Sequence, residues 1–330
     1  MKSPLLLLCL LMLNAFLPAQ DLHFEHPNVP SNLLRNRIND LMQDQQGFIW
    51  IATTNGLGRY DGEKILEFHH HQNDTTSISD EYVTCLTEDQ KGNIWIGTRR
   101  GLNLYDPQTA TIRSYDLTTE GDPLETQKIQ SVLEDHRGYI WVGTYGGLFR
   151  LQPAQQQCLY FNNDSTRHLR PLSHNNIYDI IEDAQHRLWL GTIGGISYCE
   201  NNDSFHFTNI LYDPVSPNGL DGDRFFRLVE LPNGQLWAGG HDGLFQLIEK
   251  DGLQFIRHQH QADQPNSLSY NFIEDIQVDG NGKFWIGTYK GGLNEVLLPE
   301  TPGDSLQFIH HRSNPSVPSS ISSDRVRAVL

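Results

Sequence analysis

Aromatic, basic and acidic side chains recur in short glycine-containing segments of this chain, and their chemistry suits the binding of a polar ligand. An aromatic ring offers a flat apolar surface, and charged groups beside it supply the hydrogen bonds that orient a ligand. Carbohydrates and peptides present both kinds of surface. The candidate ligand-binding residues are Arg99, Arg100, Tyr145, Arg227, His241, Asp242, Tyr289 and Lys290, and Asn55 stands at an equivalent place.

Arg227 differs from the other candidates because its position holds small or acidic residues elsewhere in a repeat that is described below. Its counterparts are Asp40, Cys85, Ser131, Asp179 and Asp275. We expect this position to lie near a central channel, where the guanidinium would pair with those carboxylates or meet an anionic ligand. The same segment departs from the pattern again, since Leu231 replaces an aspartate and Gly240-His241 replaces a threonine and a variable residue. Departures from a repeat rule often mark function.

Two patterns that resemble metal sites have simpler explanations. The run His69 to His71 would attract a transition metal, but histidines recur at the same phase at His258, His260, His310 and His311, which indicates outer strand positions. The segment Asp279 to Gly282 resembles half of an EF-hand loop, but a calcium loop needs an acidic residue at the position of Lys290. We therefore predict no metal site, no cofactor and no catalytic residue in this chain.

The tryptophans define the elements that must position these side chains. All six of them open variants of Trp-Ile-Gly-Thr-x-x-Gly-Leu, of which Trp95 to Leu102 is the clearest copy. Successive tryptophans are separated by 45, 46, 48, 48 and 48 residues. A period in the forties with tryptophan and glycine at fixed phase is typical of propellers and solenoids, whose units bury each other's apolar faces. The tryptophans are Trp50, Trp95, Trp141, Trp189, Trp237 and Trp285.

One repeat predicts four short antiparallel strands. In the third copy we expect strands at residues 129–133, 139–144, 148–151 and 158–161, separated by polar or glycine-rich turns. Four such strands per repeat make one propeller blade. No stretch of the chain has convincing helical periodicity, so we predict an all-β fold.

The repeat also assigns structural roles. An aspartate stands six residues before tryptophan in five copies, where its carboxylate would accept the free N–H groups of a turn. The indole would fill the gap between adjacent blades, and the residue two positions later is Ala52 or a glycine, which leaves room for a neighbour's side chain. We therefore interpret all six tryptophans as structural and assign them no ligand.

At these residues the sequence resembles the bacterial two-component regulator propeller repeats. Their form is Asp-x-x-Gly-x-hydrophobic-Trp-hydrophobic-Gly-Thr-x-x-Gly-Leu, and the resemblance covers nearly all of residues 21–330. It implies the ligand-sensing, extracytoplasmic part of a hybrid histidine kinase, although no kinase or receiver motif stands in this chain. The matching copies are Asp44 to Leu57, Asp89 to Leu102, Asp135 to Leu148, the looser Asp183 to Ile196, and Asp279 to Leu293 with one extra residue.

The last residues match the beginning of a further repeat. The segment Ser320 to Leu330 aligns with Ser77 to Leu86, and Leu22 to Phe24 resembles an outer strand. We therefore expect a β-propeller of four-stranded blades, with six complete blades plus the start of a seventh, in a domain of residues 21–330 that is truncated at its C-terminal end. The intact propeller would have seven blades.

The N-terminus and the composition bear on location and partners. Residues 1–20 resemble a secretory signal peptide with an apolar stretch from Pro4 to Leu17, too short to span a bilayer comfortably, and no other segment could cross a membrane. This predicts a periplasmic protein. The net charge of −16 with scattered basic residues disfavours nucleic acid. We interpret Cys85, Cys158 and Cys199, an odd number at no metal spacing, as buried small hydrophobes.

The sequence favours an extracytoplasmic sensor of a glycan-type signal that acts as a homodimer in the full-length kinase. One alternative is a secreted binding or adhesion module without a kinase. A propeller lyase or glycosidase is a further alternative, because the turn before tryptophan is similar to the sialidase Asp box. However, no spacing singles out a catalytic pair among the 40 acidic residues.

Overall fold

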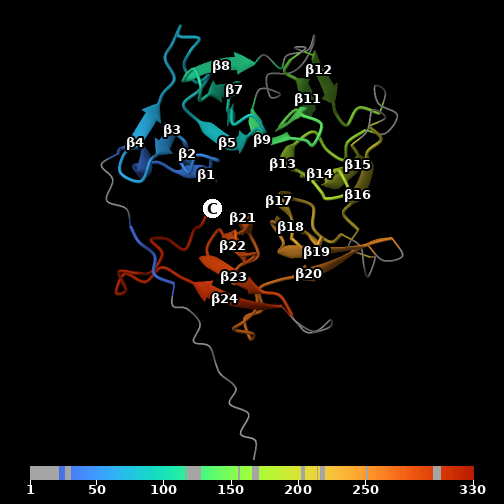
Figure 1. Ribbon diagram of the computed structural model, residues 1–330. Coiled ribbons are helices and arrows are strands. Elements are labelled where there is room, and N and C mark those ends of the chain that lie inside the picture. Colours follow the sequence, from blue (N-terminus) through green and yellow to red (C-terminus); the bar gives the residue numbers. More distant parts are fainter. Residues whose placement is uncertain are drawn as a thin grey trace, which may run out of the picture.

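The computed structural model describes residues 22–26, 31–115, 117, 128–154, 157–165, 171–201, 205–213, 215, 220–249, 252–299 and 306–330. The predicted signal peptide lies outside these residues. The described chain forms six separate four-stranded antiparallel sheets, arranged as blades around a central axis (Figure 1), and one short 3-10 helix, η1 (Leu33–Arg35). The prediction of an all-β propeller with four strands per blade is therefore confirmed for these six blades.

Each blade runs in chain order from an inner to an outer strand. Blade 1 holds β1 (Ile38–Gln43), β2 (Ile49–Thr53), β3 (Gly56–Tyr60) and β4 (Ile65–Phe68). Blade 2 holds β5 (Val83–Glu88), β6 (Ile94–Thr98), β7 (Gly101–Asp106) and β8 (Thr111–Tyr115). Blade 3 holds β9 (Ile129–Glu134), β10 (Ile140–Thr144), β11 (Leu148–Gln152) and β12 (Gln157–Phe161).

The second half repeats this order. Blade 4 holds β13 (Ile177–Glu182), β14 (Arg187–Thr192), β15 (Gly195–Glu200) and β16 (Thr208–Leu211). Blade 5 holds β17 (Phe225–Glu230), β18 (Leu236–Gly240), β19 (Leu244–Glu249) and β20 (Leu253–His258). Blade 6 holds β21 (Ile273–Val278), β22 (Phe284–Thr288), β23 (Leu293–Leu297) and β24 (Gln307–His311).

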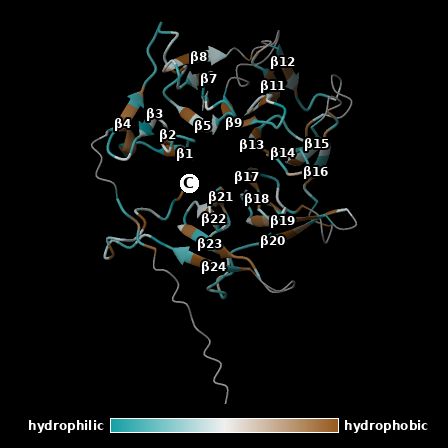
Figure 2. Ribbon diagram, in the orientation of Figure 1, coloured by the Kyte–Doolittle hydropathy of each residue, from teal (hydrophilic) through white to brown (hydrophobic). Residues whose placement is uncertain are grey.

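Apolar side chains pack between the blades. Five apolar clusters each join the tryptophan of one blade to the inner and second strands of the next, and apolar residues are concentrated in the strands (Figure 2). Trp95, for example, packs with Ile129 and Val142 of blade 3. Trp285 of blade 6 belongs to none of these clusters and is 9% exposed, whereas the other five are at most 1% exposed. Tryptophans wedged between successive sheets are thus confirmed for blades 1 to 5.

The small residue two positions after each tryptophan is required by close packing. A Cβ atom added at Gly97 would lie 2.7 Å from Ile129 Cγ2, and one at Gly143 would lie 2.8 Å from Ile177 Cγ2. Atoms without a bond between them do not approach so closely, so a larger residue would push the next blade outward. The prediction that this position leaves room for a neighbouring blade is confirmed.

The conserved spacing of aspartate and tryptophan has a second reason that the sequence alone did not suggest. The fully buried Asp135 accepts the backbone N–H groups of Arg137 and Tyr139 through Oδ1, at 2.9 and 3.0 Å, as expected. Its Oδ2 accepts the indole N–H of Trp141 at 2.8 Å. The same aspartate–indole bond, of 2.7 to 3.1 Å, recurs in four other blades, from Asp44 to Trp50, Asp89 to Trp95, Asp183 to Trp189 and Asp279 to Trp285.

Blade 5 lacks this bond. Leu231 stands in place of the aspartate, and the buried Nε1 of Trp237 has no hydrogen-bond partner. An unpaired buried donor destabilises a fold, so blade 5 tolerates a cost that its neighbours avoid. The turn of blade 5 is held instead by backbone bonds and by the Asn233 side chain, which accepts the N–H of Gln235 at 3.1 Å.

The segment after blade 6 carries no strand, so the start of a seventh blade stays a prediction. Residues 324–330 nevertheless lie against blade 6, where the N–H of Val326 donates to the carbonyl of Thr288 at 3.0 Å. A Cβ added at Gly287 would lie 2.7 Å from the carbonyl oxygen of Val326. Near the other end of the described chain, the N–H of Phe24 donates to the carbonyl of Ser319 at 3.0 Å, without forming a strand.

The cysteines and the histidine-rich segments agree largely with the sequence. Cys85 and Cys199 are buried and unpaired, but Cys158 is half-buried, so the prediction that all three are buried is wrong for Cys158. His258 and His311 end the outer strands β20 and β24 and contact tryptophans of their own blades. The interpretation as outer strand residues is confirmed for His258, His310 and His311, but it is wrong for His69 to His71 and His260, which follow the ends of β4 and β20.

The aspartate–indole bond leads to the first prediction. Asp135→Ala should lower the free energy of unfolding by about 3 kcal/mol or more, because two buried and two partly buried donors lose their acceptor. Asp61→Ala is the matched control, since Asp61 also accepts two turn N–H groups but is exposed and bonds no indole; its loss should stay below about 1 kcal/mol. Urea denaturation followed by tryptophan fluorescence measures both, and equal losses would contradict this account.

Candidate functional site

The turns that join second to third strands lie on the same face as the connections between blades, which we call the turn face. Backbone bonds fix this arrangement in four blades. The N–H of Tyr145 donates to Lys128, that of His241 to Arg224 and that of Tyr289 to Phe272, over 3.4, 3.2 and 3.0 Å. The N–H of Arg99 likewise donates to Tyr82 over 3.0 Å. The expectation that both kinds of loop share one face is therefore confirmed.

A row of aromatic rings follows the turn face from blade 3 to blade 6, and we call it the aromatic belt. Successive ring centroids lie 6.2 Å (Tyr145 to Tyr178), 4.7 Å (Tyr178 to Phe226), 5.3 Å (Phe226 to Phe272) and 5.3 Å (Phe272 to Tyr289) apart. His241 lies against Phe272 at 4.6 Å. All these residues except the exposed His241 are half-buried, so the rings are held in place and still reach solvent. The belt consists of Tyr145, Tyr178, Phe226, His241, Phe272 and Tyr289.

Positive charges flank the belt at both ends. Lys128 Nζ lies 3.8 Å from the ring centroid of Tyr145. At the other end, the guanidinium of Arg325 lies 4.2 Å and Lys290 Nζ 5.4 Å from the ring centroid of Tyr289. Cations over aromatic faces stabilise the rings and leave further N–H groups for a ligand. Of the three cations, Arg325 is also ion-paired with Glu274 at 2.6 Å.

The structure separates the candidate residues into four groups. Tyr145, His241 and Tyr289 belong to the belt, and Lys290 adjoins it. In blade 2, Arg99 lies over the Tyr82 ring at 4.2 Å, and the largely exposed Arg100 forms an ion pair with Asp80 at 3.4 Å. Asp242 is half-buried, and its carbonyl accepts a bond from Gln259 at 3.0 Å. Arg227 forms the fourth group, because it lies in the central channel.

Arg227 lies in the central channel, as the repeat position predicts. Its Nε donates to Asp275 Oδ1 at 2.7 Å, with the carboxylate almost fully buried and the guanidinium 25% exposed. The channel has a volume of about 620 Å³. It is lined by all six residues at this repeat position, Asp40, Cys85, Ser131, Asp179, Arg227 and Asp275.

Burial and charge act in opposite directions on the channel groups. Burial raises the pKa of Asp40 to about 7, although Arg227 opposes the shift, and Asp275 adds to it. Burial likewise raises the pKa of Asp179 and of Asp275, against the effect of Arg227. Burial would lower the pKa of Arg227, but the three carboxylates raise it above its ordinary value. One guanidinium thus partly compensates three buried carboxyl groups.

The channel carboxylates also join neighbouring blades. Asp40 accepts the backbone N–H of Leu86 at 2.8 Å, and Asp179 accepts that of Leu228 at 2.8 Å. Asp275 accepts the N–H of Val329 at 2.7 Å. Since these groups satisfy one another, the channel serves structure, and the aromatic belt is the better candidate for ligand binding.

Sequence reasoning missed three members of the belt. Tyr178 and Phe226 are the second residues of inner strands β13 and β17, and Phe272 directly precedes β21. Each flanks the first buried residue of an inner strand, at two phases of the repeat that the analysis of the turns alone did not cover. Tyr178 and Phe226 stand where blades 2 and 3 have Thr84 and Gln130, whereas Phe272 stands where these blades have Tyr82 and Lys128.

The comparisons with known proteins agree with this architecture. The family model of the two component regulator propeller matches residues 32–55, 77–100, 123–146, 171–194 and 267–290, in every blade except the fifth. The chain belongs to the two-component regulator propeller family. Blade 5, whose copy is not matched, is the one in which Leu231 and Gly240 depart from the pattern. No curated protein matches the sequence.

Solved structures show the same fold. An extracellular domain described as part of a hybrid two component system of B. thetaiotaomicron has a TM-score of 0.70 at 22% identity, covering 93% of this chain and 39% of that one. A second such domain from B. thetaiotaomicron has a TM-score of 0.51 at 19% identity and covers 86% and 43%. The chain thus spans about two fifths of the length of these structures.

An enzyme of the same architecture is more distant in sequence. Virginiamycin B lyase from Staphylococcus aureus has a TM-score of 0.60 at 13% identity, covering 84% of this chain and 85% of that one. This likeness concerns the fold alone, whereas the matched family is one of regulators, so the comparisons support a sensor domain rather than an enzyme. Within the described residues, no helix has the length and apolarity needed to cross a membrane.

The channel gives the second prediction. Removing one partner of a buried ion pair costs about 3–5 kcal/mol, and since Arg227 is partly exposed we expect Arg227→Met to lower the free energy of unfolding by about 2 kcal/mol at pH 8. The loss should be smaller at pH 5, because the raised pKa values let the folded carboxyl groups take up protons there.

Arg224→Met is the control for this change. The side chain of Arg224 is 49% exposed and lies 3.9 Å from the carboxylate of Asp223, which is 56% exposed. Urea denaturation at both pH values makes the comparison. A loss for Arg227→Met that is equal at pH 5 and pH 8, or no larger than the loss for Arg224→Met, would refute the charge compensation inferred for the channel.

Proposed function

We propose that this chain is the ligand-sensing propeller of an extracytoplasmic two-component sensor and that the signal is a glycan. The observation that carries the proposal is the aromatic belt with its flanking cations on the turn face. The family match and the extracellular domains with the same fold support the sensor role. These relatives are also the support for a location outside the cytoplasm.

The chemistry of the belt favours a sugar chain. A pyranose ring has one face of C–H groups, which packs against an aromatic ring, and hydroxyl groups at its edge, which need hydrogen-bond partners. The belt supplies rings at successive spacings of 4.7 to 6.2 Å, and Lys128, Lys290 and Arg325 stand at its ends. A row of rings rather than a closed pocket suits an oligosaccharide of several units.

We further propose that residues 320–330 begin a seventh blade in the complete sensor. Val326 approaches Gly287 as Ile129 approaches Gly97, and Asp275 accepts the N–H of Val329 as Asp40 accepts that of Leu86. The complete sensor would act as a homodimer in which ligand binding changes how the propellers pack, which shifts the population of the signalling state.

The test is a binding screen with alanine variants of the belt. The purified chain is applied to an array of polysaccharides, and hits are measured by titration calorimetry. Tyr289→Ala and Phe226→Ala should each weaken glycan binding about tenfold or more, because a lost aromatic contact is worth about 1–2 kcal/mol.

Tyr60→Ala is the matched control, since Tyr60 ends β3 at the opposite face of blade 1 and its hydroxyl donates to the carbonyl of the nearby Gly62. It should bind the same glycan as the unchanged chain. Binding of peptides but of no polysaccharide would overturn the choice of ligand, and glycan binding that both belt variants retain would overturn the site.

A further inference from the structure

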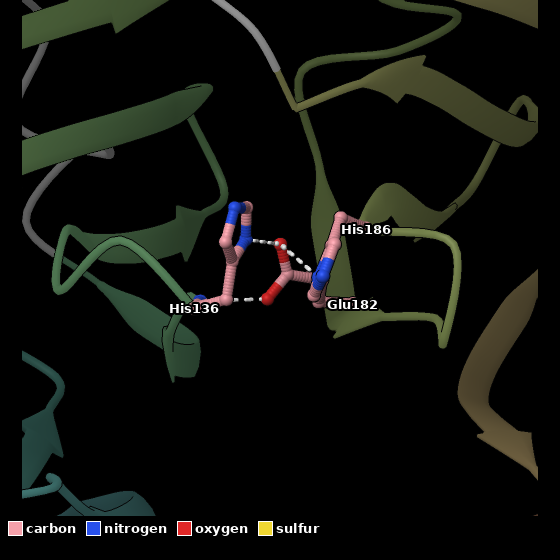
Figure 3. Close-up of side chains that lie close together, drawn as sticks. All are labelled: His136, Glu182 and His186. Atoms are coloured by element: carbon pink, nitrogen blue, oxygen red, sulfur yellow. Dashed lines mark hydrogen bonds and ion pairs between the residues drawn. The ribbon is translucent and has the colours of Figure 1, made fainter.

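A cluster of two histidines and a glutamate lies on the face opposite the turn face, where blades 3 and 4 meet. His136 belongs to the turn after β9, Glu182 ends β13, and His186 belongs to the turn after β13. Figure 3 shows the His136 ring facing the Glu182 carboxylate, with His186 beside it. One ligand atom from each residue lies within 4.8 Å of the other two.

Glu182 occupies a position with a general role in this propeller. The last glutamate of an inner strand accepts a turn N–H of the preceding blade, as Glu88 does from Gln45 at 2.9 Å and Glu230 from Ala184 at 2.8 Å. Glu182 does the same through Oε2, which accepts the N–H of His136 at 2.7 Å. Its other oxygen, Oε1, faces the rings of His136 and His186.

Both histidines depart from the repeat, and they do so at the same carboxylate. His136 stands where blades 1 and 2 have Gln45 and Gln90. His186 stands where the other five blades have glycines, and its φ of +60° lies in the left-handed region that favours glycine. Non-glycine residues are uncommon in that region, so His186 occupies a backbone conformation for which the other five blades have glycine.

The donor atoms converge on Glu182 Oε1. His136 Nδ1 lies 2.6 Å and His186 Nδ1 3.9 Å from this oxygen, and the two imidazole rings are stacked with centroids 3.9 Å apart. A tetrahedral ion with bonds of about 2.0–2.2 Å holds its ligand atoms roughly 3.4 Å apart. To bind such an ion, the distance from His136 Nδ1 to Glu182 Oε1 would lengthen by less than about 1 Å, and that from His186 Nδ1 would shorten. Rotation of the exposed rings allows both changes.

A buried side chain supports the glutamate from behind. Asn201, only 8% exposed, donates to Glu182 Oε1 at 2.8 Å and to Asp135 Oδ2 at 2.9 Å, while its own Oδ1 is buried without a partner. It thus orients the carboxylate as a supporting residue does in metal sites. The exposed fractions of the side chains, 11% for Glu182, 35% for His136 and 58% for His186, leave a path from solvent.

From this geometry we propose that His136, Glu182 and His186 bind a divalent transition metal ion such as Zn²⁺. Two imidazoles and one carboxylate select zinc and its neighbours over calcium or magnesium, and a water would complete the tetrahedron. The ion would join blade 3 to blade 4. The sequence-based prediction of no metal site weighed only other histidines and Asp279.

The test uses variants that carry the residues of other blades. His136→Gln introduces the residue found in blades 1 and 2, and His186→Gly introduces the glycine found in the other five blades. We therefore expect both turns to keep their fold. Calorimetric titration of the full chain with ZnCl2 should find one site, and each variant should bind at least tenfold more weakly. Zinc should raise the unfolding temperature of the unchanged chain but not that of the variants.

His71→Ala is the control, because His71 belongs to the other histidine-rich segment and its hydrogen bonds with Ser77 and Asp74 run through its backbone atoms. It should bind zinc as the unchanged chain does. When Co²⁺ is added in place of Zn²⁺, the unchanged chain should show the visible absorption band of tetrahedral Co²⁺. His136→Gln and His186→Gly should both lose this band. The proposal would be overturned if the unchanged chain did not bind zinc. It would also be overturned if His136→Gln and His186→Gly bound zinc as tightly as the unchanged chain does.

Discussion

One carboxylate in each of five repeats fixes both the turn between the first two strands and the tryptophan that follows. Asp135 accepts two turn N–H groups and the indole N–H of Trp141, so the plane of the indole is set by the same group that closes the turn. Because the indole packs against the next blade, a local turn also determines how neighbouring sheets meet. The ring of blades depends on this coupling of local and long-range structure.

Blade 5 illustrates what happens without it. With Leu231 in place of the aspartate, Trp237 stays buried between blades 5 and 6, but its N–H has no acceptor. The apolar packing around Trp237, which includes Leu231 itself, is thus sufficient to place the indole once five other blades define the ring. The same blade supplies Arg227 to the channel and both Phe226 and His241 to the aromatic belt, so the repeat rule is relaxed where other interactions take its place.

The sequence predicts the architecture well because the repeat determines it. The third copy places its strands within one residue of β9 to β12, and the role of Gly97 follows from size alone. The site is harder to predict, since the belt joins residues from three different phases of the repeat on adjacent blades. Tyr178 and Phe226 could not be selected without knowing that the second residue of an inner strand reaches the turn face. The convergence of His136 and His186 on Glu182 likewise depends on how two blades are set against each other.

The two faces of the propeller therefore differ in what they offer. The turn face presents aromatic rings and cations that suit an extended ligand, while the opposite face carries the glutamates that join consecutive blades. Between them, the channel carboxylates and Arg227 hold the inner strands together. A ligand on the turn face would thus act on a body that is held by polar contacts at its axis and at its opposite face.

The coupling of carboxylate and indole is tested most directly by NMR of the six indole N–H groups, assigned through tryptophan-to-phenylalanine variants. Five indole protons, bonded to aspartates, should resonate downfield and exchange slowly with solvent, while that of Trp237 should resonate upfield of them. Leu231→Asp should move the Trp237 signal downfield. Six equivalent signals, or a Trp237 signal that Leu231→Asp leaves in place, would contradict the account.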